Sequence, residues 1–343
     1  MDYLFHPARV FFEQKAFEYE KGKSLWKYFK DKENVEVKVI GSHNRVAGIP
    51  GSSAQEAFRE AKKTLVVGVR KSKEFQTCKP SAHYQLPLST SCPGKCQYCY
   101  LHTTLGKKPY LRIYVNIEEI LQMAQKYIDE RLPETTVFEG AATSDPLAVE
   151  HFTGNLAKAI SFFGKNKKSF FRFVTKFTNV DSLLDIEHNN RTRFRFSINT
   201  PFIISNYEHG TPPLEERLKA VTKVAQAHFP IGFIIGPIIT HPQWEKEYES
   251  LFITLQQVVM PHVKNGMALE LITHRFTPRA KKNILDIFPN TNLPMNEVDR
   301  KVKYGQFGYI KYVYPEEEMN VIHEKFQEFK DKYLSNVKIE YFI

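Results

Sequence analysis

The sequence predicts an α/β protein built around an open, partial βα barrel of six strands. From about residue 84, short runs rich in β-branched and aromatic residues alternate with amphipathic segments of helical length. This alternation is typical of parallel strands connected by helices. It stops after about Pro289. We therefore expect three parts: an N-terminal α/β region over residues 1–82, the barrel over 83–289, and a C-terminal hairpin and helix extension over 290–343.

Six segments are expected to form the barrel strands, because each is a short apolar run between polar or turn residues. They are Tyr84–Leu88, Thr136–Ala142, Phe170–Lys176, Arg193–Asn199, Gly232–Ile239 and Ala268–Thr273. Amphipathic spacing predicts helices over Ile117–Glu130 and Leu214–Ala227, the latter with prolines at its start. Site residues of such barrels lie at the carboxyl ends of the strands.

The flanking parts have their own patterns. Before the barrel, the sequence predicts a basic helix over Gln55–Lys63 and an apolar strand over Thr64–Val69. After it, Lys301–Tyr314 alternates basic, aromatic and glycine residues like a hairpin, and a helix over Glu316–Leu334 precedes a final strand.

Composition limits the location and the partners of the chain. The 48 basic residues exceed the 38 acidic ones by 10, which favours a polyanionic partner such as nucleic acid. Lysines also merely solubilise many surfaces. The longest apolar stretch, Ile231–Ile239, is far shorter than the roughly 20 residues of a membrane helix, and the N-terminus has no basic export signal. We expect a cytoplasmic protein with no membrane contact.

Three of the four cysteines, Cys92, Cys96 and Cys99, form a C-x3-C-x2-C run just after the first predicted barrel strand. The run is too crowded for a disulfide framework. Three thiolates suit a 4Fe-4S cluster whose fourth iron stays open to a cofactor. With aromatic Tyr98 before its last cysteine, the run resembles the signature of radical S-adenosylmethionine enzymes.

Two other interpretations of the cysteine run remain open. Zinc usually takes four ligands, so Cys78 or His102 would have to complete the set. Clustered cysteines can also be buried small hydrophobic residues without any metal.

Longer segments resemble the spore photoproduct lyase family over nearly the whole chain, which is far more specific than the cysteine run. The segments are Lys79–Tyr84, Cys96–Asn116, Phe138–Pro146, Arg172–Phe177, Thr192–Asn199, Glu270–Thr277 and Lys338–Phe342. The resemblance implies a DNA-repair lyase that uses a 4Fe-4S cluster and S-adenosylmethionine. Its substrate would be 5-thyminyl-5,6-dihydrothymine in UV-damaged double-stranded DNA of a spore or germinating cell. It further implies 5′-deoxyadenosyl radical chemistry and an electron donor such as a flavodoxin or ferredoxin.

The resemblance also assigns cofactor-binding residues. It places Ser144, Lys176, Ser197, Asn199 and Tyr98 beside S-adenosylmethionine. The first four stand at or near the ends of predicted strands, where a barrel places its site. From the residues alone, the lysine could equally be a solvated strand end and the serines ordinary turn residues.

The expected catalytic residues are Cys78, Tyr98 and Tyr100. The two tyrosines resemble a family pair that relays a hydrogen atom, although packing against a cluster is an equal alternative. Family members carry a radical-quenching cysteine where this chain has Ala142, and serine in place of Cys78. Three explanations stay open: Cys78 is a surrogate hydrogen donor, Ala142 is a deliberately introduced loss of the donor, or a tyrosine donates.

Gln306 and Phe307 are the expected substrate-binding residues. A lesion within a duplex has to be extruded, and an aromatic residue at a hairpin tip can fill the gap. The family tends to have arginine and tyrosine at these two positions, and an ordinary amphipathic hairpin is the alternative. The basic stretches Arg59–Lys73 and Lys165–Arg172 are candidates for phosphate contacts or solvated faces.

Two rival functions remain open. One is a radical enzyme that acts on another nucleic acid or on protein, such as a methylthiotransferase. That enzyme needs a second cluster, which one remaining cysteine cannot hold. The other is a non-catalytic, metal-stabilised DNA-binding protein.

Overall fold

The chain folds into two compact units. The computed structural model describes residues 3–72, 74–305 and 308–343. The first unit comprises residues 1–93 and 105–194, and the second comprises residues 94–104 and 195–343. The division predicted from the sequence, with boundaries near 82 and 289, follows the alternation of strand and helix segments and stays a prediction.

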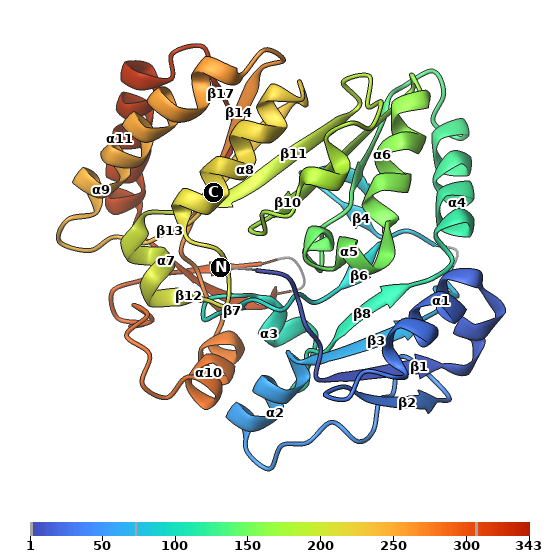
Figure 1. The fold of residues 1–343 in the computed structure, drawn as a ribbon. Coiled ribbons are helices and arrows are strands. Elements are labelled where there is room, and N and C mark those ends of the chain that lie inside the picture. The colour runs from blue at the N-terminus through green and yellow to red at the C-terminus, as the bar shows by residue number, and fades with distance from the viewer. Residues whose placement is uncertain (1–2, 73, 306–307) are drawn as a thin grey trace. The chain divides into compact units, whose positions relative to one another are not determined.

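The first unit contains a five-stranded sheet in the order β2-β1-β3-β8-β6 (Figure 1). Its strands are β1 (Arg9–Glu13), β2 (Glu36–Ile40), β3 (Thr64–Gly68), β6 (Ser89–Thr90) and β8 (Leu111–Tyr114). All pairs are parallel except β6 with β8. The helices α1 (Glu20–Phe29) and α2 (Ala54–Ala61) belong to the same unit. The predicted helix and strand over residues 55–69 are confirmed as α2 and β3, and the sheet takes strands from both sides of residue 82.

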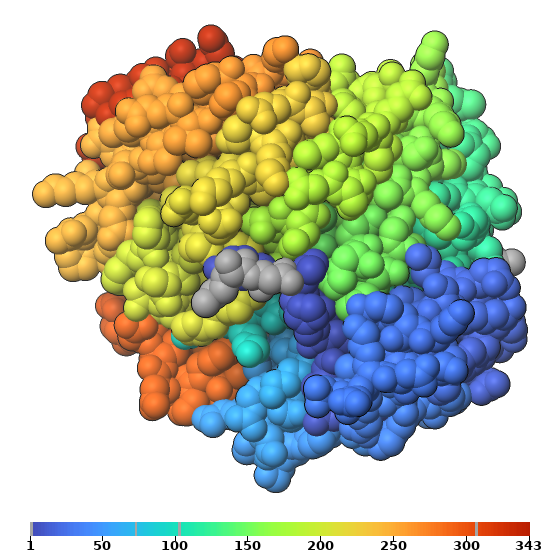
Figure 2. Space-filling view, viewed as in Figure 1, coloured from blue at the N-terminus to red at the C-terminus, as the bar shows by residue number. Residues whose placement is uncertain are grey.

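Neighbouring strands of this sheet share one apolar core. Every residue of β3 is buried, as expected of a parallel strand covered on both faces. Val10, Leu65 and Ile113 from three neighbouring strands share one apolar cluster. Phe12 meets Trp26 of α1 edge to face, with ring centroids 5.2 Å apart. In Figure 2 most of the N-terminal residues (blue) lie together at the lower right of the view.

The second sheet has eight strands in the order β17-β14-β13-β11-β10-β9-β5-β4. The first unit contributes β4 (Thr77–Cys78), β5 (Ala82–Gln85), β9 (Thr136–Glu139) and β10 (Ser169–Thr175). The strand β11 (Thr192–Ile198) begins in the first unit and ends in the second, which contributes β13 (Ile231–Ile238), β14 (Met267–Thr273) and β17 (Lys338–Phe342).

All six predicted barrel strands are present, in chain order along the sheet. The count of six is corrected to eight, because β4 pairs antiparallel with β5 at one edge and β17 pairs parallel with β14 at the other. A two-residue strand such as β4 is too short to show a period in the sequence.

Helices and short elements follow the strands. The predicted helices are confirmed within two residues at each end as α4 (Ile117–Asp129), α8 (Leu214–Gln226) and α11 (Glu316–Tyr333). The predicted hairpin is confirmed as β15 (Lys301–Tyr304) and β16 (Ile310–Val313), which pair antiparallel. The remaining α-helices and strands are α3 (Leu101–Thr104), α5 (Glu150–Thr153), α6 (Asn155–Lys165), α7 (Pro201–Tyr207), α9 (Trp244–Thr254), α10 (Pro278–Ile287), β7 (Lys95–Cys96) and β12 (Glu208–His209). Among the described residues, no helix is both long and apolar enough to cross a membrane.

Gly22 provides a test of packing in the first unit. A Cβ added there would lie 1.9 Å from the carbonyl oxygen of Ala16, whereas one added at Gly41 has nothing within 4 Å. Alanine favours a helix over glycine by about 1 kcal/mol, but such a clash costs about 1–3 kcal/mol or more. We expect Gly22→Ala to lower the thermal unfolding midpoint and Gly41→Ala to leave it nearly unchanged. Equal midpoints would contradict the close approach of α1 to the turn at Ala16.

Candidate active site

Cys92 is anchored in the first unit through the residue before it. The amide of Ser91 donates to the carbonyl of Thr143 at 2.8 Å, and Ser91 forms an isolated parallel bridge with Ser144. The hydroxyl of Ser91 donates to the carbonyl of Pro109 at 2.7 Å. The start of the cysteine run is therefore fixed beside the loop that carries Ser144, at the carboxyl end of β9.

Cys96 and Cys99 are anchored in the second unit. Cys96 lies in β7 opposite Glu208 of β12, and the amide of Gln97 donates to the carbonyl of Tyr207 at 2.8 Å. The amide of Cys99 donates back to the carbonyl of Cys96 at 3.2 Å, so the two residues share one turn. Within the described residues, no three His, Cys, Asp or Glu side chains are grouped to hold a metal ion. The ligand set stays a prediction.

Asp145 connects the loop of Ser144 to the end of β10. Its carboxylate accepts hydrogen bonds from the hydroxyl of Thr175 and the backbone amide of Lys176, both at 2.8 Å. Burial raises the pKa of Asp145 to about 6, although these hydrogen bonds oppose the change. Two of the predicted cofactor-binding residues, Ser144 and Lys176, are thereby held on adjoining loops.

The hydroxyl oxygen of Ser144 is the clearest sign of a binding site in this unit. It is buried and has no hydrogen-bond partner among the residues that the structure describes. A buried hydroxyl without a partner costs about 1–3 kcal/mol, so such groups are rare unless a ligand completes them. The amino or carboxylate group of an amino-acid cofactor would supply such a partner, so the residues present fit S-adenosylmethionine.

Ser197 and Asn199 lie at the end of β11 in the second unit, and both are buried. The amide nitrogen of Asn199 donates to the carbonyl of Pro237 at 2.8 Å. Its oxygen accepts from the hydroxyl of Tyr248 at 2.8 Å and from the amide of Thr200 at 3.0 Å. The structure therefore gives the side chain of Asn199 a supporting role at the strand end, and its contact with a cofactor stays a prediction.

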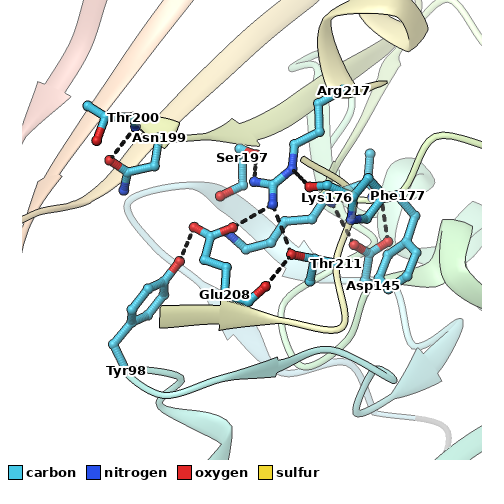
Figure 3. A network of polar contacts seen from close by, with 12 residues as sticks. Tyr98, Asp145, Lys176, Phe177, Ser197, Asn199, Thr200, Glu208, Thr211 and Arg217 are labelled. Carbon is cyan, nitrogen blue, oxygen red and sulfur yellow. Dashed lines mark hydrogen bonds and ion pairs between the residues drawn. The ribbon is translucent and has the colours of Figure 1, made fainter. Parts of the chain in front are cut away.

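A buried ion pair supports Tyr98 (Figure 3). The hydroxyl of Tyr98 donates to one carboxylate oxygen of Glu208, and the other oxygen lies 2.6 Å from Arg217. The Arg217 side chain is fully buried. Its guanidinium also donates to three oxygens at 2.8–2.9 Å, those of Pro212, Ser197 and Thr211. The ring of Tyr98 is thus fixed from the side of β12 and α8.

Full-length similarity decides the family. A family model described as spore photoproduct lyase matches residues 5–343. The chain is 48% identical to the Clostridium acetobutylicum spore photoproduct lyase and 46% identical to that of Bacillus subtilis, over 98% of each chain. The chain belongs to the spore photoproduct lyase family. It is a member of the radical S-adenosylmethionine lyases.

Solved structures of the family agree with this fold. A relative bound to a dinucleoside spore photoproduct is 44% identical, with a TM-score of 0.95 over 99% of both chains. Another, a cysteine-to-alanine and serine-to-cysteine double mutant, holds both S-adenosylmethionine and the dinucleoside lesion. It is 45% identical, with a TM-score of 0.95 over 99% of both chains.

The other predicted site residues of this spore photoproduct lyase family member differ in their exposure to solvent and in their place in the fold. Tyr100 is 57% exposed, in contrast to Tyr98. Cys78 is half-buried in β4, opposite Ala82 of β5. Gln306 and Phe307 lie outside the described residues.

Sequence reasoning missed the residues that support the site, notably Asp145, Glu208 and Arg217. For Arg217 a signal existed. It is spaced four and seven residues from Val221 and Val224, on the apolar face of α8. A charge on an apolar face indicates a buried, paired side chain.

Removing one partner of the buried pair tests the support of Tyr98. Glu208→Gln would leave Arg217 buried without a counter-charge, which costs about 3–5 kcal/mol of unfolding free energy. Replacing both residues, as Glu208→Leu with Arg217→Met, should cost less because no unpaired charge remains. Glu215→Gln, on the exposed face of α8, should change little. Urea denaturation measures all three, and a double mutant less stable than Glu208→Gln would contradict the assignment.

Proposed function

We propose that this chain reverses the spore photoproduct, 5-thyminyl-5,6-dihydrothymine, to two thymines in UV-damaged double-stranded DNA, as a carbon–carbon lyase. The observation that carries the proposal is the match to the family over residues 5–343. The hydroxyl of Ser144, which has no partner among the described residues, supports it, and a backbone bridge holds Ser144 beside Ser91, the residue before Cys92.

Cys92, Cys96 and Cys99 would hold a 4Fe-4S cluster, and Ser144, Lys176, Ser197, Asn199 and Tyr98 would bind S-adenosylmethionine. Bound there, cluster and cofactor would supply one-electron radical chemistry that begins at C6 of the dihydrothymine. The bridging carbon–carbon bond of the lesion then breaks and leaves a thymine radical. The task left to the protein is to give that radical a hydrogen atom and to exclude competing donors.

Cys78 is the hydrogen donor in this proposal. A thiol has a weak S–H bond, and Ala142 has none to give. The contacts of the Glu139 carboxylate link the segment that carries Cys78 to the segment that carries Ala142, which supports this assignment. The carboxylate accepts from the hydroxyl of Ser81 at 3.0 Å and from the amide of Ala141 at 3.1 Å. One buried side chain thereby ties the turn that follows Cys78 to the residue before Ala142.

Tyr98 and Tyr100 are the remaining predicted catalytic residues. The hydroxyl of Tyr98 is engaged with Glu208, which supports a fixed ring beside the cluster as well as a relay through it. Tyr100 is largely exposed. We assign both to the relay that returns hydrogen to the donor, as the family resemblance implies.

DNA binding would combine charge with the hairpin of β15 and β16. The net charge of +10 favours phosphate contacts. Tyr304 is 72% exposed, and Lys303 lies opposite Lys311 across the hairpin, one position before Tyr304. Gln306 and Phe307 would contact the extruded thymines or fill the gap that they leave. The electron donor would be a flavodoxin or ferredoxin in the cytoplasm of a spore or germinating cell.

Repair of the isolated lesion tests the function. The full chain, reconstituted with iron and sulfide without oxygen and reduced, should convert the dinucleotide lesion to thymidylyl-thymidine. Cys92→Ala, Cys96→Ala and Cys99→Ala should each abolish cofactor cleavage, because no other group replaces the lost thiolate. One zinc per chain without iron would instead indicate a non-catalytic, metal-stabilised protein. A cluster that cleaves cofactor but leaves the lesion intact would indicate another substrate.

Product analysis tests the hydrogen donor. Cys78→Ala should cut the thymine yield sharply and divert the product radical into adducts, such as a sulfinate when dithionite is the reductant. Ala142→Cys on that background should restore the yield, because it returns a thiol to the family's position. An unchanged yield in Cys78→Ala, or strong adduct formation in the present sequence, would rule out Cys78 and leave a lost donor or a tyrosine donor.

A further inference from the structure

Lys62 is a buried lysine beside the predicted cluster loop. It follows the last residue of α2 and is 2% exposed. Its ammonium group donates to the carbonyl oxygen of Cys92 at 2.8 Å and approaches the hydroxyl of Ser91 at 3.4 Å. It lies 5.4 Å from the ring centre of Phe58. All of these residues belong to the first unit, which fixes their mutual arrangement.

Among the described residues, no carboxylate balances the charge of Lys62. In the part of the chain that the structure describes, its ammonium forms no ion pair, and its contacts are neutral oxygens and one ring. Glu60, the nearest acid in sequence, pairs with Arg9, Arg59 and Lys63 instead. Lysine is almost never fully buried unless it is paired, because removing its charge from water is costly.

The missing counter-charge has a natural source. A cubane of four irons and four sulfides held by three thiolates carries a net negative charge, and it becomes more negative on reduction. We infer that Lys62 is a positioning residue that fixes the Cys92 carbonyl and supplies the positive charge opposite an anionic 4Fe-4S cluster. This inference rests on the proposed function, which places the cluster on Cys92.

The electrostatic consequence is a change in the ease of reduction. Net charge, hydrogen bonds and solvent exposure around a cluster set its reduction potential. A fixed positive charge stabilises the reduced, more negative form, and it acts more strongly in a buried site than in water. Lys62 should therefore raise the reduction potential of the cluster. It is hidden from solvent, so within the basic stretch Arg59–Lys73 it is not a phosphate contact.

The decisive comparison separates charge from hydrogen bonding. Lys62→Gln keeps a donor for the Cys92 carbonyl but removes the charge, and Lys62→Arg keeps the charge. Lys63→Gln is the matched control, because it removes the same charge one residue later from a side chain that is 45% exposed and paired with Glu60. The potential is measured on the reconstituted full chain by redox titration with electron paramagnetic resonance, and iron is counted for each variant.

We expect Lys62→Gln to lower the reduction potential at unchanged iron content. Lys62→Arg should stay near the parent chain, and Lys63→Gln should shift the potential much less. Equal potentials for Lys62→Gln and Lys63→Gln would overturn the inference.

A second measurement uses the cluster-free chain, so that poor loading of a variant leaves the inference testable. Without a cluster, the buried charge of Lys62 is unbalanced, so Lys62→Met should raise the thermal unfolding midpoint. A lower midpoint for cluster-free Lys62→Met would show that the lysine is a structural anchor and would overturn the inference. If the parent chain binds no iron, the proposed function fails, whereas this midpoint still reports whether the lysine charge is unbalanced.

Discussion

The burial of Arg217 is the constraint on which the second unit depends. A guanidinium has five N–H donors and keeps its charge, so a fully buried one must be surrounded by fixed acceptors. Arg217 finds them at the end of β11, in the turn before α8 and on Glu208 of β12. Glu208, held by Arg217, in turn accepts a hydrogen bond from the hydroxyl of Tyr98. The segment with Cys96 and Cys99 is thus held by the same charge that holds the strand end.

In the first unit, other buried polar groups fix the loops of the candidate site. Asp145, buried and accepting from the backbone of Lys176, fixes the loop of Ser144 against the end of β10. Lys62 fixes the carbonyl of Cys92. In each case a costly buried polar group is placed next to a residue that is predicted to bind the cluster or the cofactor. The cost is consistent with a preorganised site, because groups that are already ordered need not reorganise when cofactor and substrate bind.

The sequence predicted the parts of the fold that have a long local signal. The barrel strands β10, β11 and β13 are seven or eight residues long, and their ends were predicted within one residue. The short strands β4 and β6 have two residues each and leave no period to detect. For the candidate site, too, only residues with a local sequence signal could be predicted. The cysteine run was visible as a motif, whereas the roles of Lys62 and Glu208 depend on partners distant in sequence.

The proposed exchange of thiol positions, from residue 142 to residue 78, is compatible with the contacts of a buried carboxylate. Glu139 is 3% exposed, and its carboxylate needs several donors, which it finds in Ser81 and the backbone of Ala141, with Arg172 3.7 Å away. None of these contacts involves the side chain at 78 or 142. A thiol can therefore be lost from one loop and gained in the other while the carboxylate keeps both loops in place. The solved double mutant of a relative fits this, since it carries both kinds of substitution and matches this fold with a TM-score of 0.95. The chemistry of the donor is thus separable from the framework that positions it.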